Sequence, residues 1–439
     1  MPCKSDTTCF RLPENVAPKH YDLEIKPDIS NSSFCGSVKI LINIKSETDK
    51  IYFHTSDLKI ENAHIIKNSI KIAPLSVEFQ PKQNSCCLLF ESKLDAQTVQ
   101  LNISFSGKLE ENMKGFYLTK YYDDYKHLHN CLATHFEPND ACRAFPCFDE
   151  PSFKATFKLT VIFEANKTVL SNTPLQSIMP VGDGLTAYTF DVTPIMSTYL
   201  VAYVMGDFDC LTTYTKSGIK FGVYMPIHKV HTGIHALKIG QNFLEFYNNY
   251  FKIPYPLKKM DVIALPDISI GAMENWGLVT FREDLLLVDP EKSSKSTIKF
   301  VNLVMAHEFA HQWFGNLVTM KWWTDLWLNE GFANWIEYLS VDQCCPHLNI
   351  WKSFTSSNYC RALELDSLSH SHPIEVEIHD PSELDEIFDD ITYCKGASII
   401  HMMVNYIGQP DFLAGLQQYF HQHMYSNVTT GRIISYNIS

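Results

Sequence analysis

Two histidines four residues apart, with a glutamate directly after the first, are the side chains of this sequence best suited to chemistry. His307 and His311 lie in the segment HEFAH, and eighteen residues separate His311 from a further glutamate, Glu330. On a helix of about 3.6 residues per turn, residues four apart share one face, so both imidazoles can reach one ion. The spacing predicts one zinc ion per chain, held by His307, His311 and Glu330 and open to water at a fourth position.

Glu308 follows the first histidine and is rotated about 100° from it on a helix. It is therefore poorly placed as a ligand but well placed to touch a water on the open side of the metal. A zinc ion lowers the pKa of bound water from about 15.7 toward about 7, and Glu308 would accept the proton as the water attacks. The alternative is an apolar core helix, since Val301, Met305 and Phe309 would give this segment a broad hydrophobic surface in any case.

Three more motifs accompany the HEFAH segment, and together they resemble the M1 family of zinc aminopeptidases. They are GAMEN at 271–275, YCKGA at 393–397 and HFEPNDACRAFPCFDEP at 135–151. The zinc segment matches the family's HExxH, eighteen residues, E pattern in full. The resemblance runs from about residue 11 to about residue 430 and is closest to the puromycin-sensitive, cytosolic-type branch.

The resemblance implies roles for residues that spacing alone leaves open. Tyr393 would donate a hydrogen bond to the oxyanion of the transition state, a position that by sequence alone is more often a packing residue. Glu274 and Glu137 would bind the free α-ammonium group of a peptide. His135 stands where relatives near this branch carry glutamine, so the preference for the first side chain could shift and depend on pH, although a neutral hydrogen-bonding substitute is equally compatible. The remaining substrate-binding candidates are Gly271, Ala272, Met273 and Asn275.

The elements that must position these residues divide the chain into two parts. Up to about residue 206 the hydrophobic pattern alternates with period two, which predicts a β-rich domain. An amphipathic helix is expected from His231, short strands at 258–284, and mainly helices from 296 to about 425. Asn334, one turn beyond Glu330, is a further candidate to orient a metal ligand.

The fold class expected is therefore α+β and multidomain. The resemblance implies an N-terminal all-β saddle-like domain at 1–206 and a thermolysin-like, mainly helical zinc catalytic domain at 207–439. Members of the family normally continue with a β-sandwich and a helical cap, so the sequence is expected to be a shortened form. Its last residues, GRIISYNIS, depart from the helix that the family carries there.

Composition limits the partners and the compartment. The net charge is −13 with no basic run, so nucleic acid is not expected as a partner. The first residues, MPCKSDTTCFRLPENV, contain no apolar segment of signal-peptide length, and no membrane-spanning run is seen. An odd number of cysteines, thirteen, without CxxC spacing favours reduced thiols and a cytoplasmic location.

Four functions remain open at this point. The leading one is a zinc aminopeptidase that removes single residues from peptides with a free amino terminus. An endopeptidase on the same scaffold is the second, and Glu274 with Asn275 speaks against it. The related epoxide-hydrolysing branch has little support in these motifs. The last alternative is a catalytically impaired shortened form that binds peptides, because the expected helical cap is missing.

Overall fold

The computed structural model describes residues 11–432, which cluster into two compact units. The first unit contains 11–119, 130–206 and the short segment 379–383, and the second contains 120–129, 207–378 and 384–432. Residues 120–129, expected in the first domain, thus group with the second unit. The expectations for residues 1–10 and for the carboxyl-terminal residues 433–439 lie outside the described part of the chain.

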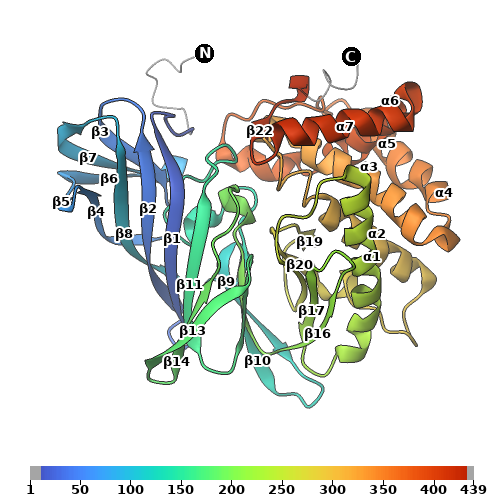
Figure 1. The fold of residues 1–439 in the computed structure, drawn as a ribbon, viewed down its shortest axis with the longest axis horizontal. Helices are drawn as coiled ribbons and strands as arrows, with labels where there is room; N and C mark the ends of the chain where they lie inside the picture. Colours follow the sequence, from blue (N-terminus) through green and yellow to red (C-terminus); the bar gives the residue numbers. More distant parts are fainter. Residues whose placement is uncertain (1–10, 433–439) are drawn as a thin grey trace. The chain divides into compact units, whose positions relative to one another are not determined.

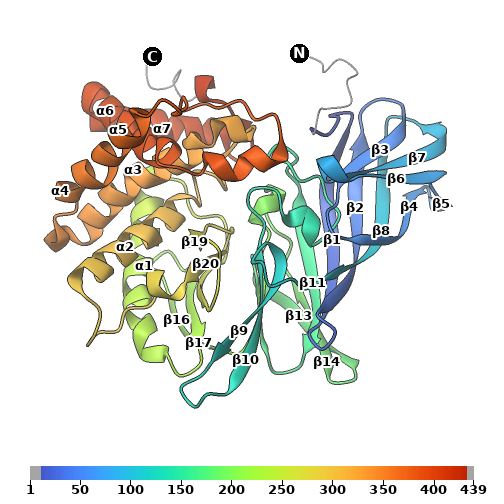
Figure 2. The ribbon, with the colours of Figure 1, turned by 180° about the vertical axis from the view of Figure 1, so that it is seen from behind.

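The first unit is built around an eight-stranded sheet, with the strands in the order β13-β14-β11-β1-β2-β8-β4-β5 (Figure 2). All neighbouring pairs are antiparallel except β1 with β11. Buried side chains alternate with exposed ones along β1 and β2, as the period of two predicts. The strands are β1 (Val16–Asp28), β2 (Ser33–Ile44), β4 (Lys59–Lys67), β5 (Ile70–Ile72), β8 (Thr98–Lys108), β11 (Thr156–Glu164), β13 (Leu175–Gly182) and β14 (Leu185–Phe190).

Two smaller sheets complete this β-rich unit, and the predicted all-β class of the first domain is confirmed. A three-stranded sheet has the order β3-β7-β6, and a four-stranded sheet has the order β12-β15-β10-β9. Their strands are β3 (Thr48–His54), β6 (Ser76–Gln80), β7 (Ser85–Leu94), β9 (Gly115–Tyr122), β10 (Leu128–His135), β12 (Thr168–Ser171) and β15 (Tyr203–Gly206).

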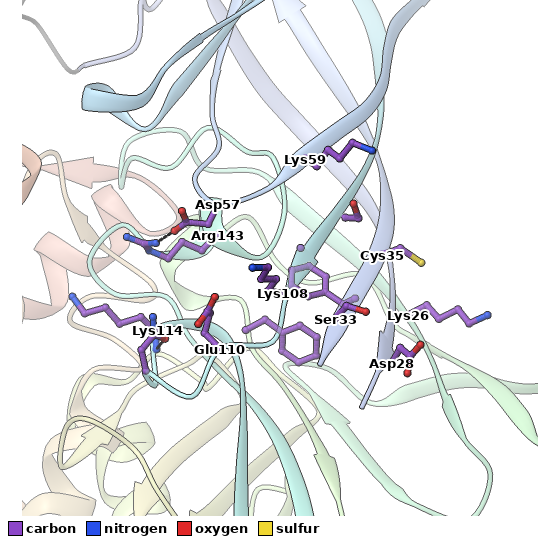
Figure 3. Close-up of a pocket in the computed structure, with 15 residues that line it drawn as sticks. Lys26, Asp28, Ser33, Cys35, Asp57, Lys59, Lys108, Glu110, Lys114 and Arg143 are labelled. Carbon is purple, nitrogen blue, oxygen red and sulfur yellow. Dashed lines mark hydrogen bonds and ion pairs between the residues drawn. The ribbon is translucent and has the colours of Figure 1, made fainter. Parts of the chain in front are cut away.

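A hollow of about 960 Å³ lies on the polar face of the eight-stranded sheet (Figure 3). Strand register forms it, because Lys26 faces Cys35, Cys35 faces Ser106, and Ser106 faces Lys59 across β1, β2, β8 and β4. The two small central residues leave space between the long outer ones. Five of the lining residues are basic and three are acidic, namely Lys26, Lys59, Lys108, Lys114, Arg143, Asp28, Asp57 and Glu110.

The second unit combines a five-stranded sheet with helices, as expected for the catalytic domain. The sheet has the order β16-β17-β18-β20-β19, with β17, β18 and β20 parallel, and α1 lies against β16 and β17 (Figure 1). The strands of this sheet are β16 (Phe208–Tyr214), β17 (Lys220–Pro226), β18 (Lys259–Leu265), β19 (Ala272–Met273) and β20 (Leu278–Arg282). Two short strands, β21 (Thr319–Met320) and β22 (Asn427–Val428), form a separate pair. The helices are α1 (Ile234–Phe251), α2 (Lys295–Ala310), α3 (Trp327–Cys344), α4 (Trp351–Phe354), α5 (Cys360–Asp366), α6 (Gly396–Ile407) and α7 (Gln409–His423).

Local sequence signals explain where α2 begins and where α1 ends. At the start of α2 the hydroxyl of Ser294 accepts a hydrogen bond from the backbone N–H of Thr297, which satisfies one of the free donors of the first turn. At the end of α1, Lys252 adopts a left-handed conformation and Pro254 follows, so the helix cannot continue. Among residues 11–432, no helix has both the length and the apolarity required to cross a bilayer.

Candidate metal centre

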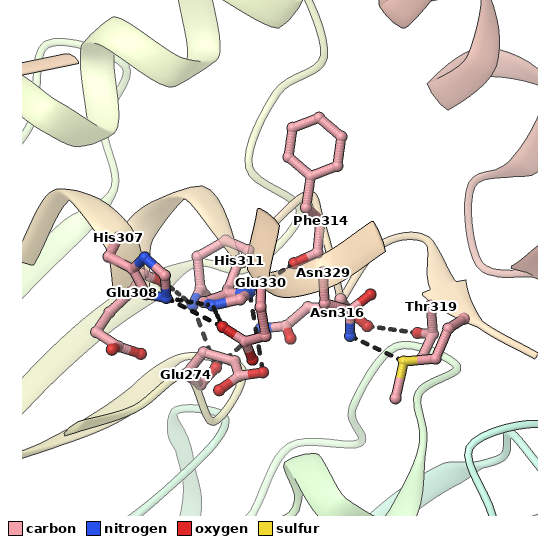
Figure 4. Close-up of polar contacts among 12 residues, drawn as sticks. Glu274, His307, Glu308, His311, Phe314, Asn316, Thr319, Asn329 and Glu330 are labelled. Atoms are coloured by element: carbon pink, nitrogen blue, oxygen red, sulfur yellow. Dashed lines mark hydrogen bonds and ion pairs between the residues drawn. The ribbon is translucent and has the colours of Figure 1, made fainter. Parts of the chain in front are cut away.

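Helices α2 and α3 bring His307, His311 and Glu330 together in the second unit (Figure 4). The two Nε2 atoms lie 3.0 Å apart, and Glu330 Oε2 lies 3.2 Å from His307 Nε2 and 3.3 Å from His311 Nε2. All three residues have ligand atoms within 4.8 Å of one another. Two imidazole nitrogens and one carboxylate oxygen converging on one point form a site that can hold a metal ion.

Each histidine is held by a second hydrogen bond on its other ring nitrogen. His307 Nδ1 lies 2.8 Å from Glu337 Oε2, and His311 Nδ1 lies 2.9 Å from the carbonyl oxygen of Phe314. Because both acceptors are oxygens, each Nδ1 carries a proton, and an imidazole that has lost its second proton can turn the lone pair of Nε2 toward the common point. The donor set and its orientation therefore fit a bound metal.

Glu337, which bonds His307, was not among the residues predicted from the sequence. It lies seven residues after Glu330 on α3, two helical turns along the same face, and that spacing was the available signal. Asn334, the candidate proposed instead, donates its Nδ2 hydrogen to Asn358 Oδ1 at 2.9 Å. The prediction that Asn334 orients a ligand is not supported by this contact, because the carboxylate of Glu337 occupies that position.

The electrostatics of the cluster reflect its burial. Burial is the largest effect on His307 and lowers its pKa, but hydrogen bonds to Glu330 and Glu337 outweigh it and hold the pKa well above its usual value. For His311 the same competition, mainly against Glu274 and Glu330, raises the pKa to about 9. Burial opposes ionisation of Glu330 as well, yet the two histidines lower its pKa to about 2.

Glu308 lies beside the cluster without belonging to it. Its side chain is buried, and its Oε2 atom has no hydrogen-bond partner among residues 11–432. Burial is the main cause that raises its pKa to about 8, and the neighbouring Glu274 and Glu330 add to the rise. A carboxylate in this environment has the affinity for a proton that a general base requires.

Tyr393 reaches the cluster from a turn of π-helix that runs from Ile391 to Lys395. Its ring stacks on the ring of His307, with centroids 6.0 Å apart and planes inclined by 21°. A close helix contact allows this approach. A Cβ added to Gly331 would lie 3.0 Å from Gly396 Cα, which is tighter than most such contacts, so glycine at both positions favours the close packing of α3 and α6.

Glu274 follows the short strand β19, which lies at the edge of the five-stranded sheet. Glu274 Oε1 is 4.0 Å from His311 Nδ1, and the side chain is buried. Burial raises its pKa, while the positive field of His311 opposes that rise. The GAMEN segment thus places a carboxylate and an unpaired strand edge beside the metal centre, as its position in the sequence suggested.

His135 and Glu137 belong to the first unit, where both are buried at the carboxyl end of β10. Their expected part in substrate binding stays a prediction. Both residues have interactions within the protein. Among the predicted residues of the second unit, the structure brings together Glu274, His307, Glu308, His311, Glu330 and Tyr393. Gly271, Ala272, Met273 and Asn275 lie in the same short segment as Glu274.

Two protein-family models together match most of the chain. The peptidase M1 N-terminal domain matches residues 17–200, and the peptidase family M1 domain matches residues 235–436. The chain belongs to peptidase family M1. The predicted family and fold class are thereby confirmed.

Several curated proteins resemble the chain over nearly its whole length. Aminopeptidase M1-D of Oryza sativa subsp. japonica is 44% identical over 96% of this chain and 48% of its own length. The puromycin-sensitive aminopeptidase of Caenorhabditis elegans is 43% identical over 96% of this chain and 44% of its own length. Endoplasmic reticulum aminopeptidase 1 of Homo sapiens is 42% identical, with 97% and 46% covered. The chain thus spans about half the length of these relatives.

Proposed function

We propose that this chain carries the catalytic centre of a zinc aminopeptidase, which hydrolyses the first peptide bond of substrates with a free amino terminus. The observation that carries the proposal is the convergence of His307, His311 and Glu330 beside the buried carboxylates of Glu308 and Glu274. Two imidazoles and a carboxylate suit zinc, which prefers such mixed nitrogen and oxygen ligands. The names of the relatives, all aminopeptidases, support the same class of reaction.

In this proposal His307, His311 and Glu330 would hold the zinc ion, which would supply Lewis-acid activation of a water molecule and of the peptide carbonyl. Glu308 accepts the proton of the attacking water and delivers it to the departing amine, a task that suits its raised pKa. Tyr393, stacked on His307, donates its hydroxyl hydrogen to the oxygen on which negative charge develops. Glu337 keeps the ring of His307 oriented throughout.

Recognition of the amino terminus is assigned to the segment 271–275 and to His135 and Glu137, which lie at and just beyond the end of β10. The carboxylate of Glu274 binds the α-ammonium group, and the free edge of β19 pairs with the extended substrate backbone. Glu137 would be the second anion for the ammonium group, and His135 would shape the pocket for the first side chain. An internal or acetylated segment lacks the charge that these groups pair with, so it is rejected.

A cytoplasmic location belongs to this proposal too. All eleven cysteines in the described part of the chain are free thiols, which suits a reducing compartment. The relatives carry names that point to different compartments, including the endoplasmic reticulum. The sequence alternatives, an endopeptidase or a non-catalytic peptide-binding protein, receive no specific support from the contacts of the metal centre.

The decisive experiment measures zinc content and hydrolysis of a leucyl fluorogenic amide by the 439-residue chain. We expect about one zinc per chain and activity that is lost on chelation and restored by zinc. The N-acetylated substrate should be cleaved far more slowly. Glu308→Gln should retain zinc while turnover falls by about 100- to 10,000-fold. Near-normal turnover in this variant, or equal cleavage of the acetylated substrate, would contradict the proposal.

A further inference from the structure

Two buried amide side chains connect the segment of Glu274 to the helix that carries the metal ligands. Gln312 Nε2 donates a hydrogen bond of 3.2 Å to the backbone carbonyl of Glu274, and Asn316 Nδ2 donates one of 2.9 Å to the same oxygen. Both side chains are fully buried. The carbonyl of Glu274 is therefore fixed by two donors from one short stretch of chain.

The same two residues are also tied to the catalytic helix. The second hydrogen on Gln312 Nε2 is donated to the carbonyl of Glu308 at 2.9 Å, and the backbone N–H of Asn316 is donated to the carbonyl of His311 at 3.0 Å. One amide group thus joins the backbone of the general-base candidate to that of the amine-binding candidate. Asn316 joins a metal ligand to the same carbonyl oxygen.

The oxygen atoms of these two amides indicate that the hydrogen bonds donated by the nitrogens have a role beyond stability. Gln312 Oε1 and Asn316 Oδ1 are buried without a hydrogen-bond partner among residues 11–432. Burying an amide oxygen without a partner is unfavourable, so these two positions tolerate amides for the hydrogen bonds that their nitrogens donate. Local violations of this kind concentrate at functional sites, where the geometry of the remaining bonds is needed.

We infer that Gln312 and Asn316 are positioning residues that set the span between the metal centre and the Glu274 carboxylate. This span determines how much of a substrate fits between its ammonium group and the scissile carbonyl, and so limits cleavage to one residue. The inference rests on the proposed function, because it assigns Glu274 to the substrate amine. Neither amide touches the substrate in this account, and both act through the backbone of Glu274.

The test removes the two donors, with a side chain of similar volume in Gln312→Met and a smaller one in Asn316→Ala. Gln312→Met, Asn316→Ala and the double variant would be assayed with free and N-acetylated leucyl amides, together with zinc content and thermal stability. Matched controls are Gln241→Met and Asn249→Ala on α1. Gln241 Nε2 donates to the Leu237 carbonyl at 2.9 Å, and Asn249 Nδ2 donates to the Glu245 carbonyl at 2.8 Å.

In the double variant we expect KM for the free substrate to rise at least tenfold, and the preference for free over acetylated substrate to fall at least tenfold. Zinc content should stay near one per chain, and the control variants should keep the wild-type preference. Unchanged preference in an active, folded double variant would overturn the inference. So would an equal loss of turnover on both substrates, which is the signature of a structural role.

The two proposals fail in different ways. If the unmodified chain with bound zinc cleaves neither substrate, the proposed function fails. If it cleaves the free substrate selectively and Gln312→Met with Asn316→Ala leaves that selectivity intact, only the positioning role fails. Glu274→Gln serves as the reference, since it removes the anion directly and should lower the preference at least as much as the double variant.

Discussion

The metal centre of the second unit and the hollow on the sheet of the first unit are both made of charged side chains, yet they are built in opposite ways. In the metal centre each imidazole is buried and has two polar partners. In the hollow, Lys26 and Lys108 are exposed, and neither side-chain ammonium group has a hydrogen-bond or ion-pair partner among residues 11–432.

Burial couples the protonation of the charged groups in the metal centre. Inside the protein, effective dielectric constants are low enough that each carboxylate changes the protonation of its neighbours, as the shifted pKa values of His311 and Glu330 show. On the exposed sheet face, water and salt screen the lysines from one another. Substitutions should therefore propagate in the first region and stay local in the second.

The largest expected effect within this comparison comes from Tyr393→Phe. Losing the hydroxyl removes a hydrogen-bond donor to the transition state, so kcat should fall about 100- to 1,000-fold while KM changes little. Steady-state kinetics on the leucyl amide measure this. Tyr406→Phe, on a side chain that is 93% exposed on α6, is the matched control and should be neutral. A variant with raised KM and preserved kcat would assign Tyr393 to substrate binding instead.

The contrast between the two regions also explains what could be predicted from the sequence. His307, Glu308 and His311 lie within one helical turn, so their spacing alone places them on one site. Glu330 followed from its distance to His311 in the sequence, but the role of Tyr393 needed the family resemblance, because more than eighty residues separate it from HEFAH. The alternating pattern of the first unit predicted strands for the same reason, since period two is a local property.

Features that depend on how distant segments meet were not predictable. Lys26, Cys35 and Ser106 form the hollow only because three strands pair in one register. The π-helical turn at Tyr393 and the contact of Gly331 with Gly396 depend on packing between α3 and α6. Glu337 lay within reach of sequence reasoning, since its spacing from Glu330 places both on one face of a helix.

The next largest effect is expected from Glu337→Gln, a substitution in the metal centre. The amide keeps the shape of the side chain but removes the negative charge that orients His307 and raises its basicity, so zinc affinity should fall about 10- to 100-fold. Competition against a chelator measures the change. Asp342→Asn removes a carboxylate near the end of the same helix and should leave the affinity unaltered. Equal affinities for Glu337→Gln and the unmodified chain would show that this hydrogen bond is not needed to orient the ligand.

The coupled charges predict a pH dependence for metal uptake. His311 has a pKa of about 9 and His307 a raised one, so at pH 7 the metal-free cluster holds at least one proton that zinc must displace. Glu330, with a pKa of about 2, is already ionised. Zinc affinity should therefore fall about tenfold per displaced proton, and so by at least about tenfold, for each unit that the pH is lowered below 7. Calorimetry in buffers of different ionisation enthalpy counts the released protons, and zero release would contradict the raised pKa values.

The smallest effects are expected for substitutions in the hollow, where exposed lysines can be compared with a partly buried arginine. Lys26→Gln and Lys108→Gln remove solvated charges, so each should change the free energy of unfolding by less than about 0.5 kcal/mol. Arg143→Gln should differ, because Arg143 is only half-exposed and bonds Asp57 as well as the buried Asp140, whose Oδ1 is 2.6 Å from its Nε. Losing that partner should destabilise the first unit by roughly 1–3 kcal/mol. Denaturant titration of the three variants measures the contrast, and equal values would mean that burial of the partner carboxylate does not decide the cost.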